Sequence, residues 1–314
     1  MYYPFLRGRQ FELIALRDLA SDNSTQGVIM PIIEPVKAST NNLSLAHNVF
    51  NAKQQKAFLI VNPQVGEIAG DNDTMLNFIF QLNSNVFSVA FHYRDNTEYI
   101  LDKIEQFNLV NCMVLGTNEI LANDPNFIRL IDSEKISHVT IEDPDKNRDL
   151  KRFLQNSHKQ FIRLDDLFER QPRNSNFLNI DSHRFSEEHK YYNQDLYDGF
   201  GDFTLLSSEF IDGGSTPRAV VIHFTYMNDR DQIWIRHFTS NTNDTIANVQ
   251  GKFGEAATKA VNYCRDNDLT NSAIVELEKY FDNQHYPGLG TVKKISLKNH
   301  LLVVGEYVRN NQIL

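Results

Sequence analysis

The sequence predicts an α/β fold: a (β/α)8, TIM-barrel-like structure with an irregular last quarter and a helical C-terminal layer. Six short apolar runs, typical of strands buried on both faces of a parallel sheet, recur before residue 166. Each run is followed by a segment with helical periodicity, and the repeat of about 23 to 30 residues is the length of one strand plus one helix. An open doubly wound sheet with an antiparallel edge is the alternative.

The first expected element is a helix in the segment RGRQFELIALRDLA, whose apolar residues stand at near-helical spacing. The six apolar runs begin near residues 28, 57, 87, 112, 137 and 160. Two further strands, at 202–210 and 219–226, would close the barrel. The segment 219–240 reads equally well as an antiparallel hairpin with NDRDQ as its turn.

We expect one compact domain, because no Ser/Pro-rich or low-complexity linker interrupts the chain. Residues 1–250 would form the barrel, with an insertion at 171–201, and residues 251–314 a helical layer packed on the same domain. The insertion would be either a contact surface for a partner protein or a lid, since exposed aromatic residues mark interfaces. Its aromatic residues are Phe177, Phe185, Tyr191, Tyr192, Tyr197 and Phe200.

The composition is that of a soluble globular protein, with 314 residues, 41% hydrophobic and 23% charged. No apolar run approaches the roughly 20 residues of a membrane span, and no signal-peptide pattern is present, so we expect a cytoplasmic protein. Cys112 and Cys264 are expected to be reduced core residues. A net charge of −9 argues against extensive binding to nucleic acid. A narrow basic groove with Arg7, Arg9, Arg170 and Arg173 would be the exception.

The candidate site residues are the polar residues that close the apolar runs. In parallel α/β barrels the active site lies at the C-terminal ends of the strands, so these side chains would meet at one rim. The candidates for catalysis are Glu34, His92, Glu142, Asp165 and His223. The candidates for substrate binding are Lys37, Asn62, Arg94, Arg163 and Ser207.

These candidate residues fit a hydrolase or transferase that acts on a phosphorylated or nucleotide-like substrate. Glu34, Glu142 and Asp165 could together hold Mg²⁺ or Mn²⁺. His92 or His223 could transfer protons, and Arg163 with Lys37 could bind an anion. A structural role is the alternative for each of them, because strands commonly end in polar residues where the chain leaves the core. A non-catalytic adaptor, sensor or immunity subunit is the alternative function.

Several familiar motifs are absent from the sequence. We find no G-x-x-x-x-G-K-[ST] loop, G-x-S-x-G elbow, H-E-x-x-H or paired C-x-x-C. Their absence argues against a P-loop NTPase and a classical dinucleotide dehydrogenase. Arg7 and Arg9 precede the first helix, where the helix macrodipole favours acidic residues. We therefore expect them to bind an anion or to pair with acidic residues of the rim.

Several blocks of the chain resemble a bacterial family known as beta family proteins, grouped with the beta protein of T-even-type phages. The blocks are YYPFLRGRQFELIALRDL, MPIIEPVK, FIRLDDLFERQPRN, FSEEHKYY, GFGDF, IHFTY, IRHF and HYPGLGTVKK. The resemblance covers nearly the whole chain. It implies a cytoplasmic protein associated with mobile elements or phage defence, with a companion protein encoded nearby. The family has no settled activity, so it supplies no catalytic residues.

Overall fold

The computed structural model describes residues 1–71, 73–213 and 217–311. Its contacts divide the chain into two compact units, which do not coincide with the expected ranges 1–250 and 251–314. The first unit comprises Met1–Leu13, Gln26–Asp166 and Glu188–Phe203. The second comprises Ile14–Thr25, Leu167–Glu187 and Thr204–Leu314, so helix α1 (Gln10–Ser21) contributes residues to both.

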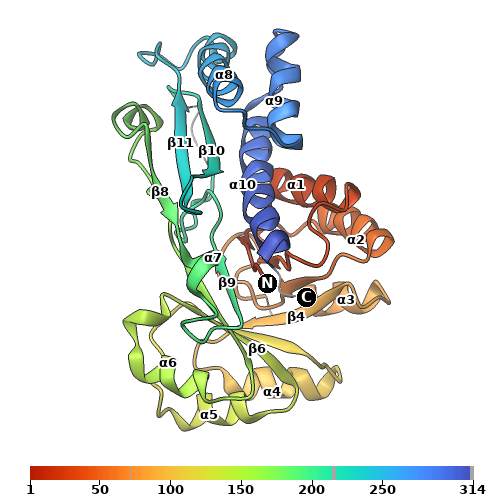
Figure 1. Cartoon of the computed structure of the whole chain (residues 1–314). Coiled ribbons are helices and arrows are strands. Elements are labelled where there is room, and N and C mark those ends of the chain that lie inside the picture. Colours follow the sequence, from red (N-terminus) through yellow and green to blue (C-terminus); the bar gives the residue numbers. More distant parts are fainter. Residues whose placement is uncertain (72, 214–216, 312–314) are drawn as a thin grey trace. The chain divides into compact units, whose positions relative to one another are not determined.

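Within the described residues, the first unit contains an eight-stranded parallel sheet, in the order β1-β2-β3-β4-β5-β6-β7-β9 (Figure 1). A parallel bridge between Tyr2 and Phe200 returns the last strand to the first, and the Tyr3 amide donates to the Phe200 carbonyl at 2.8 Å. The expected TIM-barrel-like fold is therefore confirmed. The strands are β1 Phe5–Leu6, β2 Ile32–Ile33, β3 Ala57–Ile60, β4 Phe87–His92, β5 Cys112–Gly116, β6 Ile136–Glu142, β7 Gln160–Asp165 and β9 Gly199–Asp202.

Helices alternate with these strands and cover their outer faces. Phe87 of β4 packs against Phe50 of α2, and Phe91 packs against Tyr99 of α4. The alternate residues of the strands form an apolar cluster inside the barrel, which includes Phe58, Met113 and Leu164. The helices are α2 Asn41–Lys53, α3 Thr74–Gln81, α4 Thr97–Gln106, α5 Pro125–Asp132 and α6 Arg148–Gln155, with the short η1 Pro144–Lys146 before α6.

Local capping explains where two of these helices begin. The Asp124 side chain accepts a hydrogen bond from the Asn126 amide, and Pro125 occupies the first helical position of α5. The Asn147 side chain accepts from the Leu150 amide at the start of α6. These caps fix the residues at which the two helices begin.

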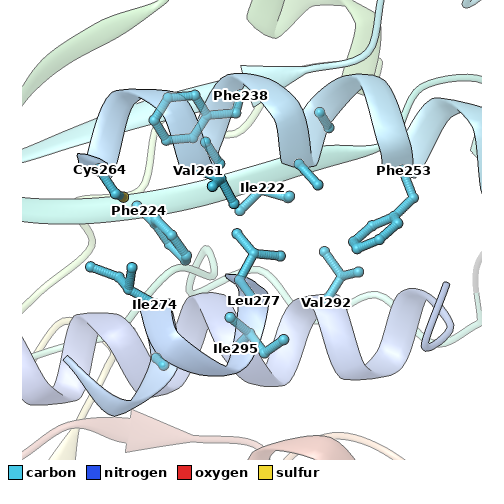
Figure 2. Close-up of a cluster of buried hydrophobic side chains, with 14 of the residues drawn as sticks. Ile222, Phe224, Phe238, Phe253, Val261, Cys264, Ile274, Leu277, Val292 and Ile295 are labelled. Atoms are coloured by element: carbon cyan, nitrogen blue, oxygen red, sulfur yellow. The ribbon is translucent and has the colours of Figure 1, made fainter. Parts of the chain in front are cut away.

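The second unit contains an antiparallel sheet in the order β10-β11-β8, formed by β10 Val221–Met227, β11 Ile233–Thr239 and β8 Ser182–Ser186. One face of the sheet packs on α8 Val249–Asp266, α9 Ser272–Asp282 and α10 Leu289–Asn311. Figure 2 shows this core, in which Ile222, Phe224 and Phe238 meet Phe253 and Leu277. The expected helical C-terminal layer is thus confirmed.

The prediction of two barrel strands at 202–210 and 219–226 is wrong. Of residues 202–210 only Asp202 is in a strand, and residues 219–226 contribute β10 to the antiparallel hairpin that was the alternative. The last barrel strand is β9, which begins inside the expected insertion 171–201 and ends at Asp202. Its glycines weaken the strand signal, yet they are required because a Cβ on Gly199 or Gly201 would collide with Tyr3.

The rest of the expected insertion is also ordinary structure of the two units. It contains η2 Asn174–Asn179, strand β8 and α7 Glu188–Tyr191. Phe177, Phe185, Tyr197 and Phe200 are buried, whereas Tyr191 is 42% exposed. Most of the rings expected at a partner surface or in a lid are therefore core residues.

Two expectations from composition can be compared with the structure. Cys112 and Cys264 are both free and buried. In the described part of the chain, no helix is long and apolar enough to cross a membrane.

Candidate active site

A ring of polar side chains follows the apolar interior of the barrel. In a strand, side chains two residues apart lie on the same face. Residues two positions beyond the interior cluster therefore point to the carboxyl end of the barrel. At this spacing stand Arg7, Glu34, Asn62, His92, Thr117 and Asp166. Glu142 joins them, because Thr140 is interior and donates to the Met113 sulfur. We call these seven residues the barrel mouth.

Glu34 is the most buried acid of the barrel mouth, with no exposed surface. Its Oε2 pairs with the Arg7 guanidinium, and its Oε1 accepts the Gln64 amide at 2.8 Å and lies 3.0 Å from His92 Nε2. Burial acts to raise the pKa of Glu34, but the hydrogen bond from His92, the charge of Arg7 and the hydrogen bond from the Gln64 amide act to lower it. The pKa of Glu34 is therefore lowered, and its carboxylate is ionised.

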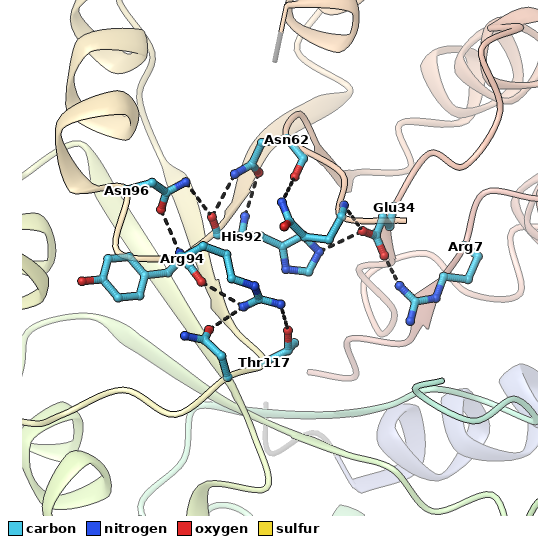
Figure 3. A network of polar contacts seen from close by, with 10 residues as sticks. Arg7, Glu34, Asn62, His92, Arg94, Asn96 and Thr117 are labelled. Carbon is cyan, nitrogen blue, oxygen red and sulfur yellow. Dashed lines mark hydrogen bonds and ion pairs between the residues drawn. The ribbon is translucent and has the colours of Figure 1, made fainter. Parts of the chain in front are cut away.

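His92 is the last residue of β4 and is held in place from two sides (Figure 3). The Asn62 side chain clamps its backbone, because Nδ2 donates to the His92 carbonyl and Oδ1 accepts the His92 amide, both at 2.8 Å. Glu34 fixes the ring itself through Nε2. Asn62, expected to bind substrate, therefore uses its side chain to position His92.

The contact with Glu34 also determines where the His92 ring carries its proton. A carboxylate only accepts hydrogen bonds, so the neutral ring places its N–H on Nε2 and leaves a lone pair on Nδ1. His92 is 3% exposed, and its Nδ1 has no hydrogen-bond partner among the residues that the structure describes. A buried ring held by a carboxylate, whose other nitrogen has a lone pair and no hydrogen-bond partner among the described residues, has the arrangement of a general base.

Arg94 supplies a second cation next to the barrel mouth. Its guanidinium donates to Thr117 Oγ1 at 2.7 Å, to the Tyr93 carbonyl at 2.9 Å and to the Asn118 side chain. Burial lowers its pKa, while the charges of Glu34 and Glu142 act to raise it. Arg94 is thus a partly buried guanidinium within the electrostatic reach of both barrel acids.

Arg163 and Asp165 do not join the barrel mouth. Ile162 and Leu164 of the same strand face the interior, so Arg163 and Asp165 point to the outer face. Asp165 accepts from Arg163 at 2.8 and 2.9 Å, and Asp145 and Glu188 also pair with that guanidinium. Burial raises the pKa of Asp165 despite its partner. This cluster has the contacts of a structural ion network.

Three further candidates are not members of the barrel mouth. Lys37 is exposed and pairs with Glu67 at 2.7 Å. Ser207 and His223 belong to the second unit, so neither closes a barrel strand. They were assigned to the rim because residues 202–210 and 219–226 were expected to be barrel strands.

The expected metal ligands are not assembled by the strands. Glu34 and Glu142 face the barrel interior, whereas Asp165 faces outward. Across the described ranges 1–71, 73–213 and 217–311, no group of three or more His, Cys, Asp or Glu side chains is placed to hold a metal ion. Binding of Mg²⁺ or Mn²⁺ stays a prediction.

Three mouth residues, Arg7, Thr117 and Asp166, were missed as site candidates. Asp166 is the interior residue of the pair Asp165–Asp166, on the same face of the strand as Ile162 and Leu164. The alternation separates Asp166 from Arg163 and Asp165, but the face that carries Arg163 and Asp165 was expected to point to the rim. Arg7 was recognised only as a cation in an unfavourable position at a helix start. Its expected ion pair is confirmed, and Glu34 is the partner.

Comparison of the chain with family models, with curated proteins and with solved structures gave no match.

Proposed function

We propose that the barrel mouth is the active site of a hydrolase or transferase, in which His92 is the general base for attack on a phosphorylated substrate. One observation carries the proposal: His92 is buried, its Nε2 lies 3.0 Å from the Glu34 carboxylate, and its Nδ1 has no partner among the described residues. Histidines with this surrounding accept protons from water or hydroxyl nucleophiles in many enzymes.

The chemistry follows from the roles of the two side chains. His92 Nδ1 would take a proton from water or from an acceptor hydroxyl as its oxygen bonds to phosphorus and the ester bond to the leaving group breaks. The ring would then be an imidazolium, which the ionised Glu34 stabilises through Nε2. Arg7 supports this role, because its pairing with Glu34 opposes protonation of the carboxylate.

Arg94 is the reason why we propose a substrate that carries a phosphate group. Planar guanidinium groups recognise phosphate through paired hydrogen bonds, and Arg94 is held at the mouth by Thr117 and the Tyr93 carbonyl. Its charge would also offset the negative charge that Glu34 and Glu142 would otherwise present to an anion.

The test is turnover of phosphate esters by the native chain and by His92→Gln. Nucleoside phosphates, sugar phosphates and a dinucleotide are incubated with each protein and followed by ³¹P nuclear magnetic resonance. The glutamine amide can still donate to Glu34, so the fold is retained, but no proton acceptor replaces Nδ1. We expect a rate loss of about 10²- to 10⁴-fold.

His47→Gln is the matched control. His47 is also a buried histidine of the first unit with a partnerless Nδ1, but its Nε2 contacts the Ser84 hydroxyl at 2.9 Å instead of a carboxylate. We expect this variant to keep its activity. Full activity of His92→Gln, or no turnover of any ester by the native chain, would contradict the proposal.

The biological setting is a separate part of the proposal. The resemblance to beta family proteins implies phage defence and a companion protein, and both stay predictions. A phage-challenge assay with the native chain, His92→Gln and His47→Gln would link the setting to the site. Loss of protection only in His92→Gln is the expected result, whereas equal protection by all three would separate defence from the proposed chemistry.

A further inference from the structure

The second unit contains a pocket of its own, with a volume of about 950 Å³. Its wall comes from the segment after β7, from β10 and from α10, and all the lining residues belong to this unit. Phe168 and Phe177 provide apolar surface, and His223 lies beside them. Pockets of about 300 to 1,000 Å³ accommodate ligands of nucleotide size.

The charges that line this pocket are mostly positive. The lining contains Arg170, Arg173, Arg218 and Lys293, and Asp244 is the acid among them. Arg170 pairs with Glu209, and Arg218 donates to the backbone carbonyl of Asp244 at 3.2 Å. Arginine and lysine side chains around a concave surface attract anions and hold phosphate groups in particular.

Three histidines on neighbouring strands of the sheet form a row, and His223 at one end of the row lines the pocket. His223 on β10 and His237 on β11 are direct register partners, and their Nδ1 atoms are 2.7 Å apart. His237 Nε2 lies 3.5 Å from His183 Nδ1 on β8, and His183 Nε2 lies 3.9 Å from Glu169 Oε1. All three rings lie on the face of the sheet opposite the apolar core.

The Glu169 carboxylate at one end of this row of histidines influences which ring nitrogens carry the protons. Glu169 makes no hydrogen bond to His183 Nε2, but its negative charge at 3.9 Å favours a proton on that nitrogen. His183 Nδ1 then accepts from His237 Nε2, and His237 Nδ1 accepts from His223 Nδ1. His223 Nε2 is left with a lone pair. Burial, followed by the charge of His183, lowers the pKa of His223 to about 3, which keeps the ring neutral near pH 7. His223 therefore presents a hydrogen-bond acceptor to the pocket.

We propose that the second-unit pocket binds a nucleotide-like phosphate ester, with its phosphate on the arginine and lysine side chains and a ligand hydroxyl or N–H donating to His223. Phe168 and Phe177 supply the apolar surface for a ring. The three kinds of contact match the three parts of a nucleotide, which are an anion, hydrogen-bond donors and a planar base. This site is distinct from the barrel mouth, because none of its residues belongs to the first unit.

Isothermal titration calorimetry of the full chain with adenosine 5′-monophosphate, adenosine and inorganic phosphate tests the proposal. We expect the monophosphate to bind at least about tenfold more tightly than adenosine, since the phosphate contacts charged donors. The variant Arg173→Ala/Arg218→Ala should weaken this binding at least about tenfold. Both side chains are exposed, so their removal leaves the fold intact.

Arg184→Ala is the matched control, because Arg184 is an exposed arginine of the same unit that pairs with Glu187 and does not line the pocket. It should bind the monophosphate as the native chain does. His223→Phe keeps the ring volume but removes the acceptor, and we expect it to weaken the monophosphate at least about threefold while leaving inorganic phosphate unaffected. His92→Gln should leave binding unchanged, which separates this site from the proposed active site.

Three results would overturn the proposal. The first is monophosphate binding that is no tighter than adenosine binding, or no detectable binding of the monophosphate at millimolar concentration. The second is native affinity in Arg173→Ala/Arg218→Ala. The third is native affinity in His223→Phe, which would remove the histidine contact from the site.

Discussion

Lowering the pH from 8 to 5 should destabilise the second unit, because His223 and His237 lie in it uncharged. Burial, with the charges of neighbouring histidines, lowers the pKa of His223 from 6.5 to about 3 and that of His237 from 6.5 to about 2. In the unfolded chain both rings bind protons below about pH 6.5. The unfolded state therefore binds more protons as the pH falls, and stability is lost from about pH 6.5 downward.

The magnitude follows from proton linkage. At pH 5, about 1.5 units below the unfolded pKa, protonation stabilises the unfolded state by about 2 kcal/mol per histidine, while the folded rings stay neutral. His223 and His237 together should therefore lower the unfolding free energy by about 4 kcal/mol between pH 8 and pH 5. Domains of ordinary stability unfold at a cost of about 5 to 15 kcal/mol, so this loss is readily measured.

Urea unfolding at several pH values, followed by tryptophan fluorescence, measures this loss. Trp234 is the single tryptophan of the sequence and lies in β11 with His237, so its emission reports on the second unit. The double variant His223→Phe/His237→Phe keeps aromatic rings beside Phe177 and should lose about 4 kcal/mol less over the same pH range. Equal pH dependence of the native chain and the double variant would refute the reasoning.

Three substitutions test the packing and the site. Arg7→Met leaves Glu34 buried without its cation and should lower the unfolding free energy by about 3 to 5 kcal/mol in urea titrations followed by circular dichroism. Phe253→Ala empties part of the second-unit core and should cost about 3 to 5 kcal/mol, measured by tryptophan fluorescence. Gly201→Ala places a Cβ against the Tyr3 carbonyl oxygen, so the Tyr3 amide should lose protection from hydrogen exchange.

Two control substitutions accompany these variants. Lys37→Met breaks an exposed ion pair with Glu67 and should leave the unfolding free energy nearly unchanged, because solvent screens the two charges. Gly254→Ala adds a Cβ within α8 that meets no atom within 4 Å, so it should be neutral or slightly stabilising. A loss for Arg7→Met as small as that for Lys37→Met would contradict the buried ion pair. Undiminished protection of Tyr3 in Gly201→Ala would contradict the tight closure of the barrel.

The sequence predicts those parts of the fold in which a strand of four or more residues contains at least three apolar residues. Strands β3 to β7 meet this condition, and each was expected near its observed position. Strand β1 has only two residues, and β9 contains two glycines, so neither shows a strand pattern. Both form because the ends of the sheet meet, as the bridge between Tyr2 and Phe200 shows, and such a long-range contact leaves no local signal.

The sequence predicts the site residues that stand at the ends of recognisable strands. Glu34, Asn62, His92 and Glu142 close apolar runs and lie in the barrel mouth. The sequence does not show which of these residues position His92. Only the three-dimensional structure shows that the Asn62 side chain holds the His92 backbone and that the Glu34 carboxylate orients the His92 ring. Arg163 and Asp165 were expected at the rim because both faces of β7 are buried, so the sequence does not show that the charged face is the outer one.

The most direct test of the proposed general base is the tautomer of His92. Long-range ¹⁵N correlation spectra of the native chain near neutral pH, with His92→Gln to assign the ring, identify which nitrogen carries the proton. We predict a proton on Nε2, facing Glu34, and an unprotonated Nδ1. A proton on Nδ1 would remove the lone pair on which the proposed chemistry depends and would contradict His92 as the general base.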